Sequence, residues 1–230
     1  MRMSLYHGLL SKEEFKPKLH SVSEACETIA SKKQYPAVLI ESSDNVGGGS
    51  PADATHVLRY LYEHQIPKYL IVIADEEAVR HAAKTGIGGK FEGWVGGKTD
   101  RKYNQEPLHG EPVLIEGRVR LLSDGKYTHR GPYMAGMKAE MGLTAVIELN
   151  HGAVLILTEK RNAPWDINHV RSVGIQPEEF EMIVVKAAVA WRSAFGELAK
   201  LAIELDTPGC CSSNLAHFQY QRLPESTIRI

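Results

Sequence analysis

The sequence predicts an α/β fold, a mixed sheet with βαβ units and a β-rich central insertion. In the first third of the chain, short apolar runs alternate with amphipathic segments in the order strand, helix, strand, helix. Because this alternation is typical of parallel strands joined by crossover helices, a parallel sheet is expected there. In residues 87–158, apolar and polar positions alternate between glycine-rich turns, which indicates β-hairpins. A length of 230 residues suits one large domain or two small ones.

The amino-terminal elements follow from periodicity and from helix-start signals. Residues 22–31 have helical spacing, and residues 37–41 form a short apolar run that predicts a buried strand. Behind it, Ser50 is expected to be an N-cap, with Pro51 at the first helical position. The buried face of this helix should consist of Val57, Leu58, Leu61 and Tyr62.

The later elements are predicted by the same signals. The next strand should end at Asp75, and the helix behind it should end at Gly86. Asp124-Gly125 marks a hairpin turn, and residues 144–159 predict a second hairpin. The remaining predictions are helices at 166–174 and 187–200, a buried strand at 181–186, and a loop-rich tail from Thr207.

Composition excludes several classes of protein. A formal charge of -1 gives no basic surface for nucleic acid or for an acidic membrane. Three cysteines, two of them adjacent as Cys210-Cys211, argue against a disulfide framework and for a reducing compartment, so a cytoplasmic protein is expected. No apolar run resembles a signal peptide or a membrane span, and the chain should be soluble.

The loop "DNVGGGS" is the strongest local signal for a site. It follows a strand and precedes a helix, the position at which open α/β sheets bind ligands and at which helix N–H groups attract anions. Asp44, Asn45 and Gly47-Gly48-Gly49 are therefore candidate binding residues for a phosphate or carboxylate. The loop is not a P-loop, because no Lys-Ser/Thr pair follows the glycines. A tight turn capped locally by Asp44 and Asn45 is an equally good interpretation.

Two cations lie near the next strand end, while the histidines and cysteines give no metal motif. Lys186 ends a predicted strand and Arg192 follows in the helix behind it, so both could face the cleft of the Asp44 loop, although a snorkelling lysine and a surface arginine fit the spacing better. Neither H-E-x-x-H nor C-x-x-C occurs among the ten histidines and three cysteines. Surface positions are expected for His81, His109 and His129, and small apolar roles for Cys210 and Cys211.

Five segments in order resemble the C-terminal domain of the MlrC family of metallopeptidase-like proteins. They are "SSDNVGGGSPADAT", "GIGG..EGWVGGK", "LLSDGKY..RGPYMAGMKAEMG.TAVIEL", "GIQPEEFEMIVVKAAVAWRSAF" and "DTPG". The resemblance implies a lead-in at 1–20, the domain at 21–222 and a tail at 223–230. It also implies that the D-N-x-G-G-G loop is a wall of the cleft that faces the other half of the protein.

The same resemblance implies where the metal should be. Family members carry an N-terminal domain whose Asp and His residues hold a catalytic zinc, so no zinc site is expected in this chain. The family segment K-S-x-x-H-F-R is present here as "KAAVAWR", residues 186–192, which keeps Lys186 and Arg192 and loses the serine and the histidine. Together with the ending "LPESTIRI", this difference predicts little hydrolytic activity for the chain alone, and no catalytic residue is assigned.

Two functional hypotheses follow. The first is the substrate-side, C-terminal domain of an MlrC-like zinc-dependent peptidase or amide hydrolase. Its partners would be a metal-bearing N-terminal half or partner chain, a peptide or small amide substrate, and a second copy in a homo-oligomer. The second is a catalytically inactive binding or structural module with the same fold.

Overall fold

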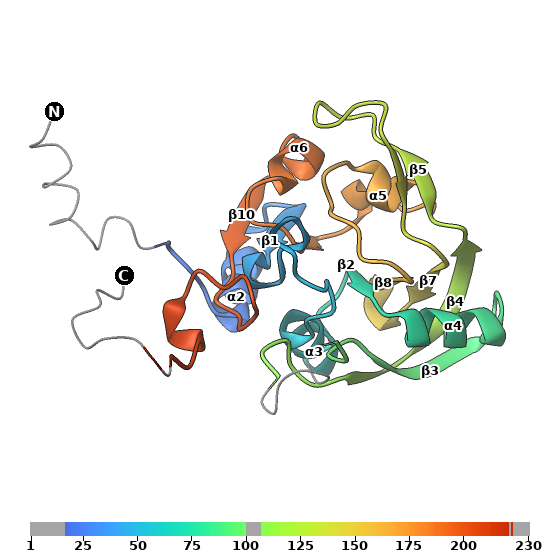
Figure 1. The fold of residues 1–230 in the computed structure, drawn as a ribbon, viewed down its shortest axis with the longest axis horizontal. Coiled ribbons are helices and arrows are strands. Elements are labelled where there is room, and N and C mark those ends of the chain that lie inside the picture. Colours follow the sequence, from blue (N-terminus) through green and yellow to red (C-terminus); the bar gives the residue numbers. More distant parts are fainter. Residues whose placement is uncertain (1–16, 100–106, 221, 223–230) are drawn as a thin grey trace, which may run out of the picture.

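A computed structural model describes residues 17–99, 107–220 and 222 as one eight-stranded mixed sheet with elements packed on both faces (Figure 1). The strand order is β10-β1-β9-β2-β8-β7-β4-β3, and β5 and β6 form a separate two-stranded sheet. The α/β prediction is confirmed. The predicted lead-in and tail lie almost entirely outside the described residues.

The five strands from β10 to β8 run parallel, and β7, β4 and β3 continue the sheet with antiparallel pairings. The predicted central β-rich segment therefore extends the main sheet. The strands are β1 (Ala37–Ile40), β2 (Tyr69–Ala74), β3 (Lys90–Val95), β4 (Val113–Ser123), β5 (Lys126–Thr128), β6 (Lys138–Glu140), β7 (Thr144–Glu148), β8 (Val154–Thr158), β9 (Met182–Val185) and β10 (Leu201–Glu204).

Helices cover the two faces unequally. Apolar side chains of α2, α3 and α4 pack on one face of the sheet, and those of α5, α6 and the β5–β6 pair pack on the other. Every residue of β1, β8 and β9 is buried, as expected for strands covered on both faces. The helices are α2 (Val22–Lys32), α3 (His56–Glu63), α4 (Glu76–Thr85), α5 (Asn168–Arg171) and α6 (Trp191–Phe195).

Three helix boundaries follow from capping. Ser21 and Glu24 form a reciprocal capping box at the start of α2, and the carboxylate of Asp75 accepts the Ala78 N–H at the start of α4. Gly86 ends α4 with a positive φ, as predicted from the sequence.

Three predictions about boundaries were wrong. Ser50 is not an N-cap, because the Asp44 carboxylate takes the N–H groups of Ala52 and Ala54 and holds this stretch irregular, so α3 begins at His56. Asp124-Gly125 does turn the chain, but it joins β4 to β5, and β4 pairs instead with β3 and β7. The predicted helix 187–200 is reduced to α6, which ends before Gly196, a poor helix former.

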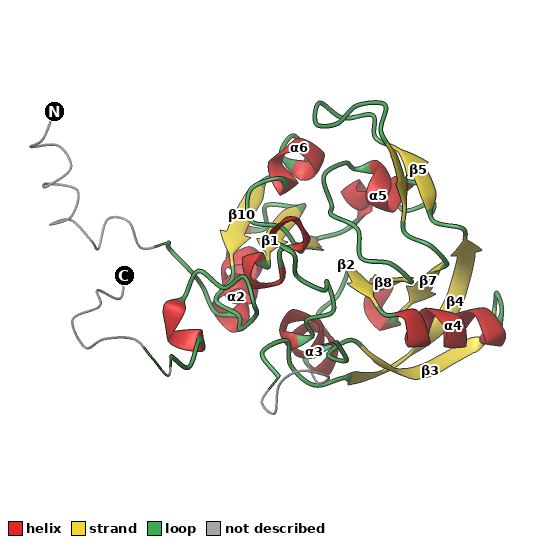
Figure 2. Cartoon of the chain, viewed as in Figure 1, coloured by secondary structure: helices red, strands yellow, loops and turns green. Residues whose placement is uncertain are grey.

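Long irregular segments gather at one edge of the sheet, the edge at which the parallel strands end (Figure 2). No helix among the described residues is both long and apolar enough to cross a membrane.

Candidate functional site

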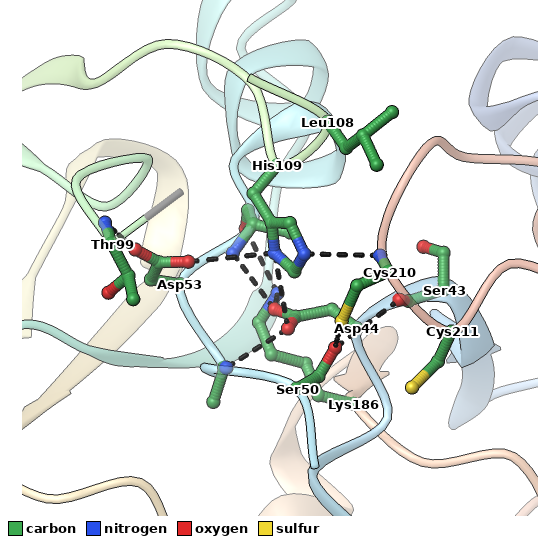
Figure 3. Close-up of polar contacts among 12 residues, drawn as sticks. Ser43, Asp44, Ser50, Asp53, Thr99, Leu108, His109, Lys186, Cys210 and Cys211 are labelled. Carbon is green, nitrogen blue, oxygen red and sulfur yellow. Dashed lines mark hydrogen bonds and ion pairs between the residues drawn. The ribbon is translucent and has the colours of Figure 1, made fainter. Parts of the chain in front are cut away.

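The loops that follow β1, β9 and β10 meet at the carboxyl edge of the parallel sheet (Figure 3). Glu41 and Asp44 come directly after β1, Lys186 directly after β9, and Cys210 from the loop after β10. A fourth contribution, His109, comes from the segment between β3 and β4. Open α/β sheets place their ligand sites at this edge.

The centre of the cluster is a buried ammonium between two buried carboxylates. Lys186 Nζ lies 2.7 Å from Glu41 Oε2 and 2.8 Å from Asp44 Oδ2, and it donates a hydrogen bond to the Ala54 carbonyl at 2.9 Å. All three side chains are at most 5% exposed. The ammonium therefore has an acceptor for each of its three N–H groups.

The buried charges of the cluster shift one another's pKa values. Burial raises the pKa of Glu41 to about 7, against the opposing pull of Lys186. Burial also disfavours charge on Asp44, but Lys186 and His109 outweigh it and lower the pKa of Asp44 to about 2. Burial lowers the pKa of Lys186, and the two carboxylates more than reverse this and raise it. Lys186 and Asp44 thus form a stable ion pair, whereas the pKa of Glu41 lies close to neutral pH.

His109 connects this ion pair to two further loops. Its Nδ1 lies 3.5 Å from Asp44 Oδ1 and 3.6 Å from Asp53 Oδ1, and its Nε2 accepts the Cys210 backbone N–H at 3.2 Å. Burial lowers the pKa of His109, but Asp44 and then Cys210 and Asp53 raise it to about 9. The raised pKa favours the imidazolium, whereas the Cys210 N–H that points at Nε2 requires the neutral ring with its proton on Nδ1; the hydrogen bond is the direct geometric observation, so we assign the neutral Nδ1–H tautomer to this conformation. The prediction of surface positions is confirmed for His81 and wrong for His109 and His129, which are 2% and 3% exposed.

The glycine loop is held firmly at its base and is exposed at its tip. Gly47, Gly48 and Gly49 are exposed, and Arg161 clamps the end of the loop by donating to the carbonyls of Gly49 and Ser50 at 2.6 and 3.2 Å. A side chain at Gly48 would meet Cys211 Sγ at 2.8 Å, so this glycine permits a close approach of the neighbouring loop.

The backbone N–H groups of the loop all have acceptors within the protein. Those of residues 44–50 donate to Glu41, Ser42, Lys186, Asn45 and Val46, and the Asn45 side chain accepts the one from Gly47. The local-turn interpretation therefore describes the geometry of Asn45. In this conformation the loop offers a surface without side chains and no unused N–H group.

Most of the predicted site residues lie close together in the structure, and Arg192 lies apart from them. Asp44 and Lys186 are in direct contact, and the loop 45–49 lies immediately above them. Arg192 is exposed on α6 and places its guanidinium 4.9 Å from the centre of the Trp191 ring. Within the described residues it forms no hydrogen bond or ion pair with Asp44 or Lys186.

An open groove of about 680 Å³ lies beside the glycine loop at the ends of β2 and β8. Its polar walls include Asp75, Lys98 and Arg161. Lys98 Nζ binds Asp75 at 3.1 Å, and Arg161 connects the groove to the glycine loop through the two carbonyls that it binds. Sequence reasoning missed Arg161 and His109 as site residues, because each lies far from the loop in the chain and has no motif around it. Asp53 lies close to the loop, but its contact with His109 could not be predicted from the sequence.

The described residues do not fit a zinc ion. They contain no group of three or more His, Cys, Asp or Glu side chains arranged to hold a metal. Two acidic side chains of the cluster, Glu41 and Asp44, share the Lys186 ammonium.

Comparison with known proteins gives the family. The model of the MlrC C-terminus matches residues 39–222. The chain belongs to the MlrC C-terminus family. This MlrC C-terminus domain is 25% identical over 191 residues to Microcystinase C from Sphingomonas sp., a match that covers 83% of the chain and 35% of the relative. The predicted resemblance is therefore confirmed.

A solved structure agrees with the sequence match. The domain resembles the crystal structure of a candidate metallopeptidase from Mesorhizobium sp. BNC1 with a TM-score of 0.79 and 27% identity, over 95% of this chain and 43% of that one. The chain thus spans less than half the length of both relatives.

Proposed function

We propose that this chain is the substrate-side, C-terminal domain of an MlrC-like zinc-dependent peptidase or amide hydrolase. The zinc would be held by an N-terminal half or by a partner chain. Membership of the MlrC C-terminus family supports the general kind of protein, and the name of the Mesorhizobium relative, a metallopeptidase, supports a peptidase that uses a metal.

The observation that carries the proposal is the buried Lys186 between Glu41 and Asp44. Here the carboxyl edge of the sheet holds a buried, fully paired protein cation next to an open groove and an exposed glycine loop. A zinc ion, when bound by the other half, would polarise the substrate carbonyl and activate water. The residues of this chain would bind and orient the substrate.

Each predicted site residue has a role in this proposal. Gly47, Gly48 and Gly49 form a wall to which a peptide backbone can approach closely, and Asp44 and Lys186 hold that wall from beneath. The exposed guanidinium of Arg161 faces the groove and would bind a substrate carboxylate with the N–H groups that it does not use on the loop. Asn45 would line the wall, and Arg192 would contact only a substrate that extends to α6.

A catalytically inactive binding or structural module is the second candidate. The satisfied N–H groups of residues 44–50 favour it, because they leave no donors ready for an anion or a developing oxyanion.

Peptide binding and cleavage separate the two candidates. Saturation-transfer NMR with short peptides that have a free terminal carboxylate should detect binding to the wild-type chain, and Arg161→Gln should abolish it. The matched control is Arg120→Gln, an exposed arginine on β4 paired with Glu148, which should leave binding unchanged.

Cleavage is then assayed with the zinc-loaded N-terminal part of Microcystinase C added to the chain. Zinc-dependent cleavage that needs both parts and is lost with Arg161→Gln supports the hydrolase domain. Binding with no cleavage in the mixture supports the inactive module. Equal signals from wild type, Arg161→Gln and Arg120→Gln would show that the groove assignment is wrong.

A further inference from the structure

The segment after β10 brings together a serine, a histidine and an aspartate. Ser212 Oγ lies 2.8 Å from His217 Nδ1, and His217 Nε2 lies 3.4 Å from Asp206 Oδ1. These side chains are of the types that serve as a nucleophile, a base and a group that orients the base. The three residues are distinct from the Lys186 ion pair and from the walls of the groove beside Arg161.

Backbone hydrogen bonds fix the base and the aspartate. Asp206 lies shortly after β10 and donates its N–H to the His20 carbonyl at 2.8 Å. His217 ends the short 3₁₀ helix Leu215–His217, and its N–H donates to the Asn214 carbonyl at 3.2 Å. The side-chain amide of Asn214 also donates to both carboxylate oxygens of Asp206 at 3.0 Å. The carboxylate is therefore oriented by a second side chain while it faces the imidazole.

The surroundings of the imidazole decide which nitrogen carries the proton. Because Nε2 of His217 faces the Asp206 carboxylate, the proton of the neutral ring belongs on Nε2 and the lone pair of Nδ1 faces Ser212. Ser212 Oγ also lies 3.4 Å from the Asn214 carbonyl oxygen and accepts the Asn214 N–H at 3.2 Å. The contact with Nδ1 is the shorter of the two that the hydroxyl proton can make, so we assign the Ser212 O–H to His217.

The backbone next to Ser212 offers a donor for a developing oxyanion. Ser213 is exposed, and its N–H has no acceptor in the part of the chain that the structure describes. The N–H of the residue after the nucleophile is a usual oxyanion donor in serine hydrolases. An ester has a better leaving group than an amide and demands less of a single donor, so this site fits an ester better than a peptide bond.

We propose that Ser212, His217 and Asp206 form a hydrolytic site for small carboxylic esters. The Ser212 proton passes to His217 Nδ1 as Oγ bonds to the carbonyl carbon. The bond from that carbon to the alcohol oxygen then breaks, and the imidazolium gives its proton to the departing alkoxide. Water attacks the acyl-serine with the help of the same imidazole, which releases the acid and returns a proton to Ser212. Asp206 is a positioning residue that holds the imidazole.

This activity does not depend on the proposed zinc hydrolase. Its nucleophile, base and oxyanion donor all come from residues 206–217 of this chain. The assays therefore contain EDTA, which removes any metal-dependent hydrolysis and makes the two proposals fail separately.

Labelling with a fluorophosphonate tests the nucleophile. The folded full chain is incubated with the probe, and tandem mass spectrometry locates the adduct. Ser212 should react at least about a hundredfold faster than its exposed neighbour Ser213, because Ser212 has a base at 2.8 Å. The urea-unfolded chain should show no preference between the two. No adduct at Ser212, or equal rates at both serines of the folded chain, would overturn the proposal.

Hydrolysis of p-nitrophenyl acetate tests turnover. Ser212→Ala should reduce the rate to that of the urea-unfolded chain, and the matched control Ser31→Ala, an exposed serine on α2, should leave it unchanged. A folded Ser212→Ala variant as active as wild type would contradict the assignment. If Ser212→Ala does not fold, the labelling pattern of the wild-type chain still decides.

Rescue experiments separate the base and its positioning residue from merely structural roles. His217→Ala should slow labelling of Ser212 about a hundredfold, and added imidazole should restore part of the rate. Asp206→Ala should slow it about tenfold, and Asp206→Glu should restore part of that loss. Labelling of Ser212 that stays at the wild-type rate in folded His217→Ala would show that the histidine is not its base.

Discussion

Lys186 is the residue on which the geometry of the carboxyl edge most depends. Its ammonium is the only cation in direct contact with both Glu41 and Asp44 within the described residues, and it also fixes the Ala54 carbonyl. Removal of one partner from a buried ion pair leaves an uncompensated charge, which costs far more than the pair itself contributes.

Lys186→Met should therefore lower the free energy of unfolding by about 3–5 kcal/mol. Urea denaturation at pH 7 measures this change. Arg192→Met is the matched control, because it removes an exposed guanidinium that is stacked on Trp191 and should cost no more than about 1 kcal/mol. The double variant Glu41→Gln/Lys186→Met should recover part of the loss. A single Lys186→Met variant as stable as wild type would contradict the ion-pair account.

Gly48 and Gly49 are both exposed, but alanine at the two positions should destabilise the protein for different reasons. Gly48→Ala places a methyl group 2.8 Å from Cys211 Sγ and should cost about 1–3 kcal/mol by overpacking. Gly49 has open space but a φ of 101°, so Gly49→Ala should cost about 1 kcal/mol from backbone strain. Cys211→Ala should relieve the first variant and not the second in thermal unfolding. The same relief for both would show that contact with Cys211 is not the cause.

At the scale of elements, α5 carries a buried histidine that makes the layer formed by α5, α6 and β5–β6 sensitive to acid. His169 is 3% exposed, its Nδ1 has no partner within the described residues, and its ring lines a cavity of about 20 Å³. Burial, followed by the charge of His129, lowers the pKa of His169 to about 4. The folded state therefore favours the neutral ring.

The expected pH dependence follows from the sign of this shift. The unfolded chain binds a proton at His169 below about pH 6.5 and the folded chain only near pH 4, so stability should fall as the pH falls through this range, by up to about 3 kcal/mol. His169→Gln should flatten that decline in urea titrations at several pH values. The exposed histidine variant His81→Gln should keep the wild-type slope. An unchanged slope in His169→Gln would assign the decline to other groups.

Elements with a local signal were predictable from the sequence, and those set by distant contacts were not. The β7–β8 hairpin and the cap at Gly86 depend on neighbouring residues, and both were predicted correctly. The late start of α3 depends on Asp44, whose carboxylate accepts the N–H groups of Ala52 and Ala54. These residues follow Asp44 by eight and ten positions in the sequence. The position of His109 depends on contacts with Asp53, which is 56 positions earlier in the chain, and with Cys210, which is 101 positions later. No local pattern records such contacts.

At the scale of the whole molecule, the parallel strands are covered on both faces, whereas β3 and β4 at the end of the sheet leave apolar side chains exposed. The outer face of β3 and β4 exposes Trp94 and Leu114, which are cross-strand neighbours and are 59% and 40% exposed. We expect this apolar pair to mediate self-association or contact with the proposed other half.

Sedimentation velocity at increasing concentration tests that expectation. Wild type should associate, and Trp94→Glu should shift the chain to monomer by placing a charge in the apolar contact. Val189→Glu is the control, since Val189 is 67% exposed and lies in the segment before α6. A monomeric wild type, or an association that Trp94→Glu does not change, would exclude this face as the contact.

Zinc titration by calorimetry is the most direct test of the central claim that the metal of the proposed hydrolase lies outside this chain. The full chain, with its cysteines kept reduced, should show no stoichiometric binding of zinc at micromolar concentration, because Lys186 already occupies the space between Glu41 and Asp44. Added zinc should likewise give no peptidase activity to the chain alone. One equivalent of zinc bound tightly, and lost in Asp44→Asn or His109→Gln variants that remain folded, would contradict the account and place the metal in this domain.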